Sequence, residues 1–228
     1  MALTRAETLR LLPGTLVTLA LIGAAAYSLP KYVDHRIDLY MTQHDVAGHG
    51  NSRTKAEVVA AQDFLRKNRK SISIGMPSQR EKANAGLKQI VVFTDYRCTY
   101  CKAMERYLDG DKTVKIKVVF KELPILGESS KTLSLYALAA DRAGKYLDYR
   151  AHMLAIPSPS ESDARTFFER KQIKAPDAQE LQQLEKLVAA NAAEAKGLAI
   201  KGTPAIVVGN SILYGWNPNE FKAKILSF

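Results

Sequence analysis

The stretch FTDYRCTYCKAM, residues 93–104, carries both cysteines of the chain, Cys98 and Cys101, three positions apart. It overlaps the end of QIVVFTDY, residues 89–96, a β-favouring apolar run typical of a buried strand. After the cysteines the pattern is helical to about Leu108. The sequence therefore predicts a strand that feeds directly into a helix, with the cysteine pair at the junction.

This junction predicts different roles for the two thiols. Cys98 is expected at the N-terminus of the helix, where unsatisfied backbone N–H groups stabilise an anion and lower a thiol pKa. Cys101, one turn later, is within bonding reach of Cys98 but is directed into the fold. We therefore predict that Cys98 is the exposed nucleophile and Cys101 the resolving thiol. The two would form a redox disulfide and exchange through a mixed disulfide at Cys98.

Metal binding is the alternative chemistry for a cysteine pair. A structural zinc site needs four ligands, which disfavours zinc because only histidines could complete the set. Two thiolates alone can hold Cu(I), since soft ligands select it. A Cu(I)-binding, metal-handling module therefore stays as the second interpretation, and we assign no further metal ligand and no cofactor. The histidines considered for a shared zinc site are His35, His44, His49 and His152.

The bulk composition is that of a folded globular chain. The sequence has 228 residues, of which 46% are hydrophobic and 25% charged. This is enough apolar material for a sizeable core, so a structural disulfide is not needed for stability. Two cysteines in such a chain therefore point to chemistry.

The positive charge is concentrated ahead of the cysteines. The net charge is +10, and residues 53–88 contribute nine basic against three acidic residues, a net of +6. This segment is either a solvated connector face or a surface attracted to anionic lipid head groups or an acidic partner. Its single aromatic, Phe64, and the lack of any nucleic-acid motif exclude nucleic acid as the expected partner.

The N-terminal segment predicts export. Residues 11–29, LLPGTLVTLALIGAAAYSL, contain no charged residue, Arg10 precedes them and Lys31 follows. Residues 1–30 are either an uncleaved signal anchor or a signal peptide cleaved after Ala26. Both interpretations send the rest of the chain out of the cytoplasm. In an oxidising compartment a disulfide can persist.

Residues 31–86 are interpreted as a basic connector with short helices and no core of its own. The capping box of Thr54 and Glu57 predicts a helix over Lys55–Asn68. The stretch GMPSQREKANAG, residues 75–86, is predicted to be a loop.

The C-terminal part alternates between strand and helix patterns. We predict a second strand over residues 114–123, then helices from residue 129 to about 195, interrupted by a loop at 156–162. Gly197 is predicted just past the last of these helices. A hairpin turning at Gly209-Asn210 and a final helix capped by Asn217, with Pro218 and Glu220 in its first turn, complete the pattern. The expected α/β fold has a parallel strand pair joined through a helix, a helical block, and an antiparallel pair that closes the sheet.

Four stretches together resemble a known family. FTDYRCTYCKAM, FKELPILGESS, AGKYLDYRAHML and GLAIKGTPAIVVGN follow one another as in DsbA-like thioredoxin-fold thiol–disulfide oxidoreductases, with the closest likeness to the ScsC/Com1-like branch. The resemblance covers residues 87–228. It implies a thioredoxin fold with a helical insertion at about residues 128–196, preceded here by the membrane helix and connector. It also implies thiol–disulfide exchange in the bacterial envelope.

The resemblance adds a substrate-binding loop. It implies that the Thr203–Pro204 bond is cis and that this loop faces the active cysteines. Thr203 and Pro204 would then present backbone groups to an extended substrate, as in strand addition.

The chain departs from the family at two places. The family often has an acid six residues before the first cysteine, and here that position is Val92. Either Glu122 moves the proton of the buried thiol, or water does. Between the cysteines stand Thr99 and Tyr100, where the branch usually has Pro-Tyr, so the helix entry differs.

The direction of the redox reaction is left open, although threonine before the cis-proline resembles reductases and isomerases. The expected location is the periplasm, with an inner-membrane anchor at residues 11–29 or, alternatively, a cleaved and soluble chain. Expected partners are exported proteins with cysteines and an unidentified membrane redox protein. Residues 31–70 are either a homo-oligomerisation segment or a spacer.

Overall fold

The structure, a computed structural model, describes residues 53–77, 87–110 and 116–228, all within one compact unit, Gly50–Phe228. The predictions for residues 1–52, including the apolar segment 11–29, lie outside the described residues. So do those for 78–86 and 111–115.

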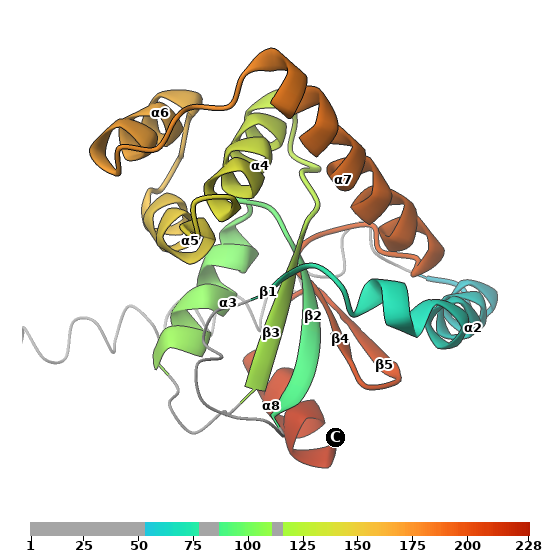
Figure 1. Cartoon of the computed structure of the whole chain (residues 1–228). Coiled ribbons are helices and arrows are strands. Elements are labelled where there is room, and N and C mark those ends of the chain that lie inside the picture. Colours follow the sequence, from blue (N-terminus) through green and yellow to red (C-terminus); the bar gives the residue numbers. More distant parts are fainter. Residues whose placement is uncertain (1–52, 78–86, 111–115) are drawn as a thin grey trace, which may run out of the picture. The chain divides into compact units, whose positions relative to one another are not determined.

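A five-stranded mixed sheet, in the order β1-β3-β2-β4-β5, lies at the centre (Figure 1). Neighbours β2 and β3 are parallel, whereas β1–β3, β2–β4 and β4–β5 are antiparallel. The predicted parallel pair and closing hairpin are therefore confirmed. The strands are β1 (Met76–Pro77), β2 (Lys88–Thr94), β3 (Ile116–Glu122), β4 (Ala205–Val208) and β5 (Ser211–Tyr214).

Helix α3 connects the parallel strands, and the chain between β3 and β4 is helical. The turn of the hairpin has Gly209 in the left-handed region at φ 56°, and the Asn217 side chain caps α8. The described helices are α2 (Lys55–Ile72), α3 (Thr99–Gly110), α4 (Glu128–Asp141), α5 (Tyr146–Ala155), α6 (Glu161–Arg170), α7 (Ala178–Gly197) and α8 (Pro218–Ser227).

The sheet buries a different set of helices on each face, because successive strand residues point to opposite sides. On the first face, Ile90 and Val92 of β2 pack with α3, α4, α5, α6 and α8. On the second face, Val91 and Phe93 pack with α2 and the end of α7. In Figure 1, α3 lies to the left of the strands and α2 to the right.

Helix α2 belongs to the second face, although its sequence lies in the predicted connector. Its buried Leu65 and Ile72 join the apolar cluster of β2, β3 and β4. The predicted capping box is present, since Thr54 and Glu57 exchange hydrogen bonds. The predicted end at Asn68 is wrong: Asn68 is a non-helical kink (φ −110°, ψ 17°), and the helix continues to Ile72.

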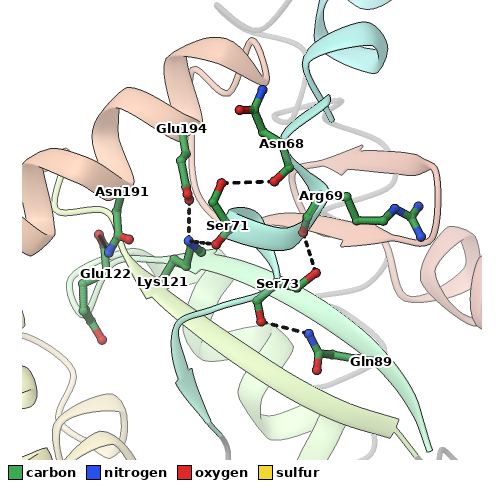
Figure 2. A network of polar contacts seen from close by, with 9 residues as sticks. All are labelled: Asn68, Arg69, Ser71, Ser73, Gln89, Lys121, Glu122, Asn191 and Glu194. Atoms are coloured by element: carbon green, nitrogen blue, oxygen red, sulfur yellow. Dashed lines mark hydrogen bonds and ion pairs between the residues drawn. The ribbon is translucent and has the colours of Figure 1, made fainter. Parts of the chain in front are cut away.

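A polar network ties α2 and α7 to β3 (Figure 2). The Lys121 side chain of β3 is 4% exposed and forms an ion pair with Glu194 of α7. Its Nζ also donates to the Ser71 carbonyl near the end of α2, at 3.3 Å. Asn191 of α7 donates to the Glu122 carbonyl at 3.0 Å. A single buried cation therefore joins three elements.

Gly197 was predicted to follow α7, but it is the last helical residue, and Leu198 is the C-cap. The left-handed backbone falls instead on Ala199, at φ 53°. A Cβ on Gly197 would lie 2.4 Å from Cζ of Phe64 in α2. The glycine thus lets the Phe64 ring of α2 pack directly on the backbone of α7, a tertiary contact that no local pattern reveals.

Two predicted loops contain short regular elements. Met76–Pro77 pairs with β3 as an edge strand, a position that tolerates proline. The preceding Gly75 passes so close to β3 that a Cβ would lie 2.8 Å from the Phe120 carbonyl oxygen. Within the predicted loop 156–162, α6 already begins at Glu161, because Ser160 and Asp163 form a capping box.

Candidate redox site

Cys98 lies directly before α3, where its carbonyl accepts a hydrogen bond from the Lys102 N–H at 3.2 Å. Its own N–H donates to the Asp95 carbonyl, also at 3.2 Å. Cys98 thus occupies the capping position of the helix, as the sequence predicts. The prediction that Cys98 is exposed is wrong, because Cys98 is only 7% exposed, although Cys101 is buried more completely.

Asp95 fixes the turn between β2 and α3 to the loop after β3. This buried carboxylate accepts from the Arg97 N–H at 2.8 Å and the Ser130 hydroxyl at 2.7 Å. It also accepts from the N–H groups of Ile125 and Leu126, at 2.9 and 3.1 Å. Sequence reasoning missed this role, although an acid between a buried strand and the first cysteine is the available signal.

The two thiols have pKa values displaced in opposite directions. The hydrogen bond from Cys101 and the N–H groups of Tyr100 and Cys101 lower the pKa of Cys98 to about 6, against the opposing effect of burial. Burial, followed by the neighbouring Cys98, raises the pKa of Cys101. At neutral pH the reduced pair therefore holds its negative charge on Cys98.

The loop before β4 contacts the nucleophile. The Thr203–Pro204 peptide bond is cis, as the family resemblance implied. The protonated thiol of Cys98 donates to the Thr203 carbonyl at 3.0 Å, and both residues of the loop are buried. Residues about a hundred positions apart thus meet at one sulfur.

Thr99 and Tyr100, between the cysteines, form the first residues of α3. The Thr99 side chain is exposed, whereas Tyr100 is half-buried and packs against the first-face core. In the reduced form described, both cysteines are free thiols.

Glu122 lies at the end of β3 beside Thr94, in parallel register. Its buried carboxylate accepts hydrogen bonds from three hydroxyl groups. The donors are Tyr96 at 3.1 Å, Tyr146 at 2.7 Å and Ser134 at 2.9 Å. Burial raises the pKa of Glu122, against Arg150 and these hydroxyls. Among the described residues, the Glu122 carboxylate makes no direct hydrogen bond to Cys98 or Cys101.

The described residues contain no group of three His, Cys, Asp or Glu side chains such as a metal site would require. His152, one of the histidines considered for zinc, packs beside Phe167 with ring centroids 5.6 Å apart. Within the described parts of the chain, no helix has the length and apolarity needed to cross a bilayer.

A CxxC pair at the start of a helix, facing a cis-proline loop across a mixed sheet, defines the class: thioredoxin-fold proteins, here with a helical block between β3 and β4. The chain belongs to the thioredoxin family Thioredoxin_4, whose model matches residues 67–225. The match begins inside α2, so it includes part of the segment that the sequence assigned to the connector.

Solved structures confirm the DsbA-like fold. The thiol–disulfide exchange protein alpha-DsbA2 from Wolbachia pipientis is 22% identical, with a TM-score of 0.62 over 77% of this chain and 99% of that chain. The catalytic domain of Proteus mirabilis ScsC is also 22% identical, with a TM-score of 0.62 over 73% and 97%. A periplasmic thioredoxin-like protein from Salmonella enterica serovar Typhimurium is 23% identical, with a TM-score of 0.55 over 61% and 83%. No curated protein sequence matches the chain.

Proposed function

We propose that the protein is a thiol–disulfide oxidoreductase whose redox centre is Cys98-Thr-Tyr-Cys101. The proposal rests on the different environments of the two thiols. Cys98 has its pKa lowered to about 6 and lies 3.0 Å from the Thr203 carbonyl, while Cys101 is enclosed behind it.

The proposed reaction has two exchange steps. In the reducing direction, the Cys98 thiolate attacks one sulfur of a substrate disulfide, and the other substrate sulfur leaves as a thiolate that takes up a proton. The Cys101 thiolate then attacks Cys98, forming the Cys98–Cys101 disulfide and releasing the second substrate thiolate. Two electrons pass from the pair to the substrate, and oxidation of a dithiol is the reverse sequence.

The surface beside Cys98 suits an extended polypeptide. Thr203 supplies a backbone carbonyl for strand addition. Ile125 and Leu126, held next to the CxxC turn by Asp95, have side chains 45% and 48% exposed. Apolar side chains on both sides of a reacting disulfide would find contact there.

The thiolate of Cys98 bears on the reduction potential, while the direction of the reaction stays open between oxidation and reduction or isomerisation. A lowered pKa stabilises the reduced form, so it raises the reduction potential. A pKa of about 6 lies between those of thioredoxin, about 7, and DsbA, about 3.5. We therefore propose a potential between about −270 and −120 mV, the values of thioredoxin and DsbA, with the about −180 mV of protein disulfide isomerase between them. Thr203 before the cis-proline is consistent with this.

We propose the bacterial envelope as the location, with residues 11–29 as anchor or cleaved signal, exported cysteine-containing proteins as substrates and a membrane protein as redox partner. The similarity to a periplasmic thioredoxin-like protein from Salmonella enterica serovar Typhimurium supports this location. We also propose that residues 31–70 are a homo-oligomerisation segment.

Insulin reduction and refolding of a scrambled disulfide protein test the proposal. We expect wild type to be active, Cys98→Ala to be inactive, and Cys101→Ala to accumulate a mixed disulfide detectable by intact mass. The proposal fails if wild type and Cys98→Ala are equally inactive. If the purified wild type then also holds one equivalent of Cu(I), the metal-handling interpretation replaces it.

A further inference from the structure

The start of α2 is fixed to the segment that joins α7 to β4. Nε of Arg53 donates to the Ala199 carbonyl at 2.6 Å, and the guanidinium stacks on the Tyr214 ring of β5, with Cζ 3.5 Å from the centroid. Glu57, one turn further on, forms an ion pair with Lys201 at 2.9 Å. Figure 1 shows α2 beside the end of α7. We call these two contacts of α2 with the segment after α7 the α2 clamp.

The clamped segment has an uncommon backbone conformation. Ala199 lies in the left-handed region at φ 53°, which residues with a Cβ rarely adopt. Its own carbonyl accepts from Arg53, and the preceding carbonyl, that of Leu198, accepts from the Tyr214 hydroxyl at 2.9 Å. Side chains from α2 and β5 therefore fix the peptide groups on both sides of this residue.

The segment leads directly to the loop that contacts the nucleophile. Thr203, whose carbonyl accepts from the Cys98 thiol at 3.0 Å, lies two residues beyond Lys201. Two residues of chain span at most about 7 Å. On the other side of the loop, the Pro204 carbonyl accepts from the Gly215 N–H at 2.9 Å. The loop is thus held by the sheet on one side and by the α2 clamp on the other.

We propose that Arg53 and Glu57 are positioning residues for substrate binding, because they hold the loop so that the Thr203 carbonyl stays where an extended substrate can pair with it. The inference rests on the proposed function, since it concerns the loop that would bind the substrate. Neither side chain would touch the reacting sulfurs. The functional unit would then begin ahead of residue 67, where the match to the family model starts.

The two contacts of the clamp should differ in weight. Arg53 is half-buried, and a hydrogen bond from a charged donor is stronger than a neutral one. Glu57 and Lys201 are 38% and 41% exposed, so water screens their ion pair. Without the clamp the loop would also populate positions that cannot pair with a substrate, and the apparent affinity falls with the fraction of competent loop. Binding, rather than the exchange step, is therefore the quantity to measure.

The first experiment compares two disulfides that release the same thiol. One is a linear peptide whose single cysteine is disulfide-linked to thionitrobenzoate, and the other is the small symmetric disulfide of thionitrobenzoate, which has no strand to pair. Each is mixed with reduced full-length protein, and the coloured thiolate is followed over a range of concentrations. We expect Arg53→Met to raise the half-saturating concentration of the peptide about tenfold, as loss of one charged hydrogen bond implies. The limiting rate and the rate with the small disulfide should not change.

Further variants separate positioning from general damage to the fold. Arg53→Lys keeps the charge and should restore part of the affinity for the peptide. Glu57→Gln and Lys201→Met should each raise the half-saturating concentration about twofold, and the double variant no further, because the two side chains form one exposed pair. Arg66→Met is the matched control on the same helix. Arg66 pairs with Asp63 of α2 and is 65% exposed, so no change is expected.

The inference is overturned if Arg53→Met leaves the half-saturating concentration of the peptide unchanged, or if Arg66→Met raises it as much. It is also overturned if Arg53→Met slows both disulfides to the same degree, since the defect would then lie at Cys98 itself. The small disulfide tests the proposed function separately, because wild type should reduce it and Cys98→Ala should not. The clamp can therefore fail while the oxidoreductase proposal stands, whereas an inactive wild type would remove both.

Discussion

Lys121 and Glu122 are adjacent in β3, and both are buried, at 4% and 0% exposure. Their side chains point to opposite faces of the sheet. Lys121 joins α2 and α7 through Ser71 and Glu194 (Figure 2). Glu122 accepts from Tyr96, Tyr146 and Ser134 in the face that contains Arg150.

The two sites differ in what they lead to. The contacts of Lys121 end in helix backbone and an ion pair at a helix that closes the second face. The polar groups around Glu122 border Arg150, whose guanidinium lies 3.4 Å from the Thr94 hydroxyl at the end of β2, next to the turn that leads to the CxxC. Burial of a charge thus does not identify chemistry by itself, because both sites are buried and only one lies beside the cysteine pair.

The largest effect is expected where the comparison assigns structure alone. Lys121→Met leaves Glu194 without its cation, and removing one partner of a buried pair costs about 3–5 kcal/mol of unfolding free energy. Denaturant unfolding measures this, and the Cys98 pKa should not move. Lys131→Met is the matched control. Lys131 of α4 forms a 2.7 Å ion pair with Glu185, which lies in α7 like Glu194, but the two side chains are 39% and 45% exposed. A loss of about 1 kcal/mol or less in unfolding free energy is therefore expected. If Lys121→Met did shift the Cys98 pKa, the conclusion that Lys121 has a structural role alone would be wrong.

The second effect belongs to the redox face and depends on pH. Because the folded pKa of Cys98 is lowered to about 6, its thiolate stabilises the reduced protein above the unfolded thiol pKa. This contribution is lost as pH falls through about 6. We expect about 2–4 kcal/mol from the shift. Comparing unfolding of reduced wild type and Cys98→Ser across this range measures it, and parallel pH profiles would contradict it.

The smallest effect concerns Glu122. Its folded pKa is raised by burial, so its contribution to stability is complete below the unfolded pKa of about 4.3 and is lost as pH rises through the folded value. Glu122→Gln should remove this dependence and change stability less than Lys121→Met does. Unfolding free energies of wild type and Glu122→Gln are measured upward from about pH 4. As pH rises, wild type should lose stability relative to the variant. A difference that grows with pH would mean that the carboxylate is stabilised when charged.

The sequence predicts the position of Cys98 at the start of a helix well, because the signals for it are local. A β-favouring run, a CxxC and a helical pattern place Cys98 at a helix start without knowledge of any other element. The contact between Cys98 and Thr203 required the family resemblance, since no local rule brings together residues so far apart.

What the sequence misses depends on tertiary contacts. Arg150 shares a stripe with Tyr146 and Met153, i and i+3 or i+4 apart, so its burial is readable, but its contact with Thr94 is not. Gly197 looks like a helix terminator, and only the Phe64 ring from α2 explains it. The sequence pattern likewise does not show where the connector ends and the domain begins. Leu65 and Ile72 of α2 are buried by contact with the sheet, which a local pattern does not reveal.

If an extended peptide binds at Thr203 as proposed, the hydrogen bond between the Cys98 thiol and the Thr203 carbonyl, 3.0 Å long, would link that binding to the ionisation of Cys98. A polypeptide strand that pairs with Thr203 would donate its own N–H to the same oxygen and compete with the thiol for it, which would favour the thiolate because the donors to the thiolate remain. Affinity for an extended peptide should then rise with pH across the Cys98 titration. Calorimetry in buffers of different ionisation enthalpy would count the protons released on binding, and the count should be largest between the Cys98 pKa of the complex and that of the free protein and fall towards zero at higher pH.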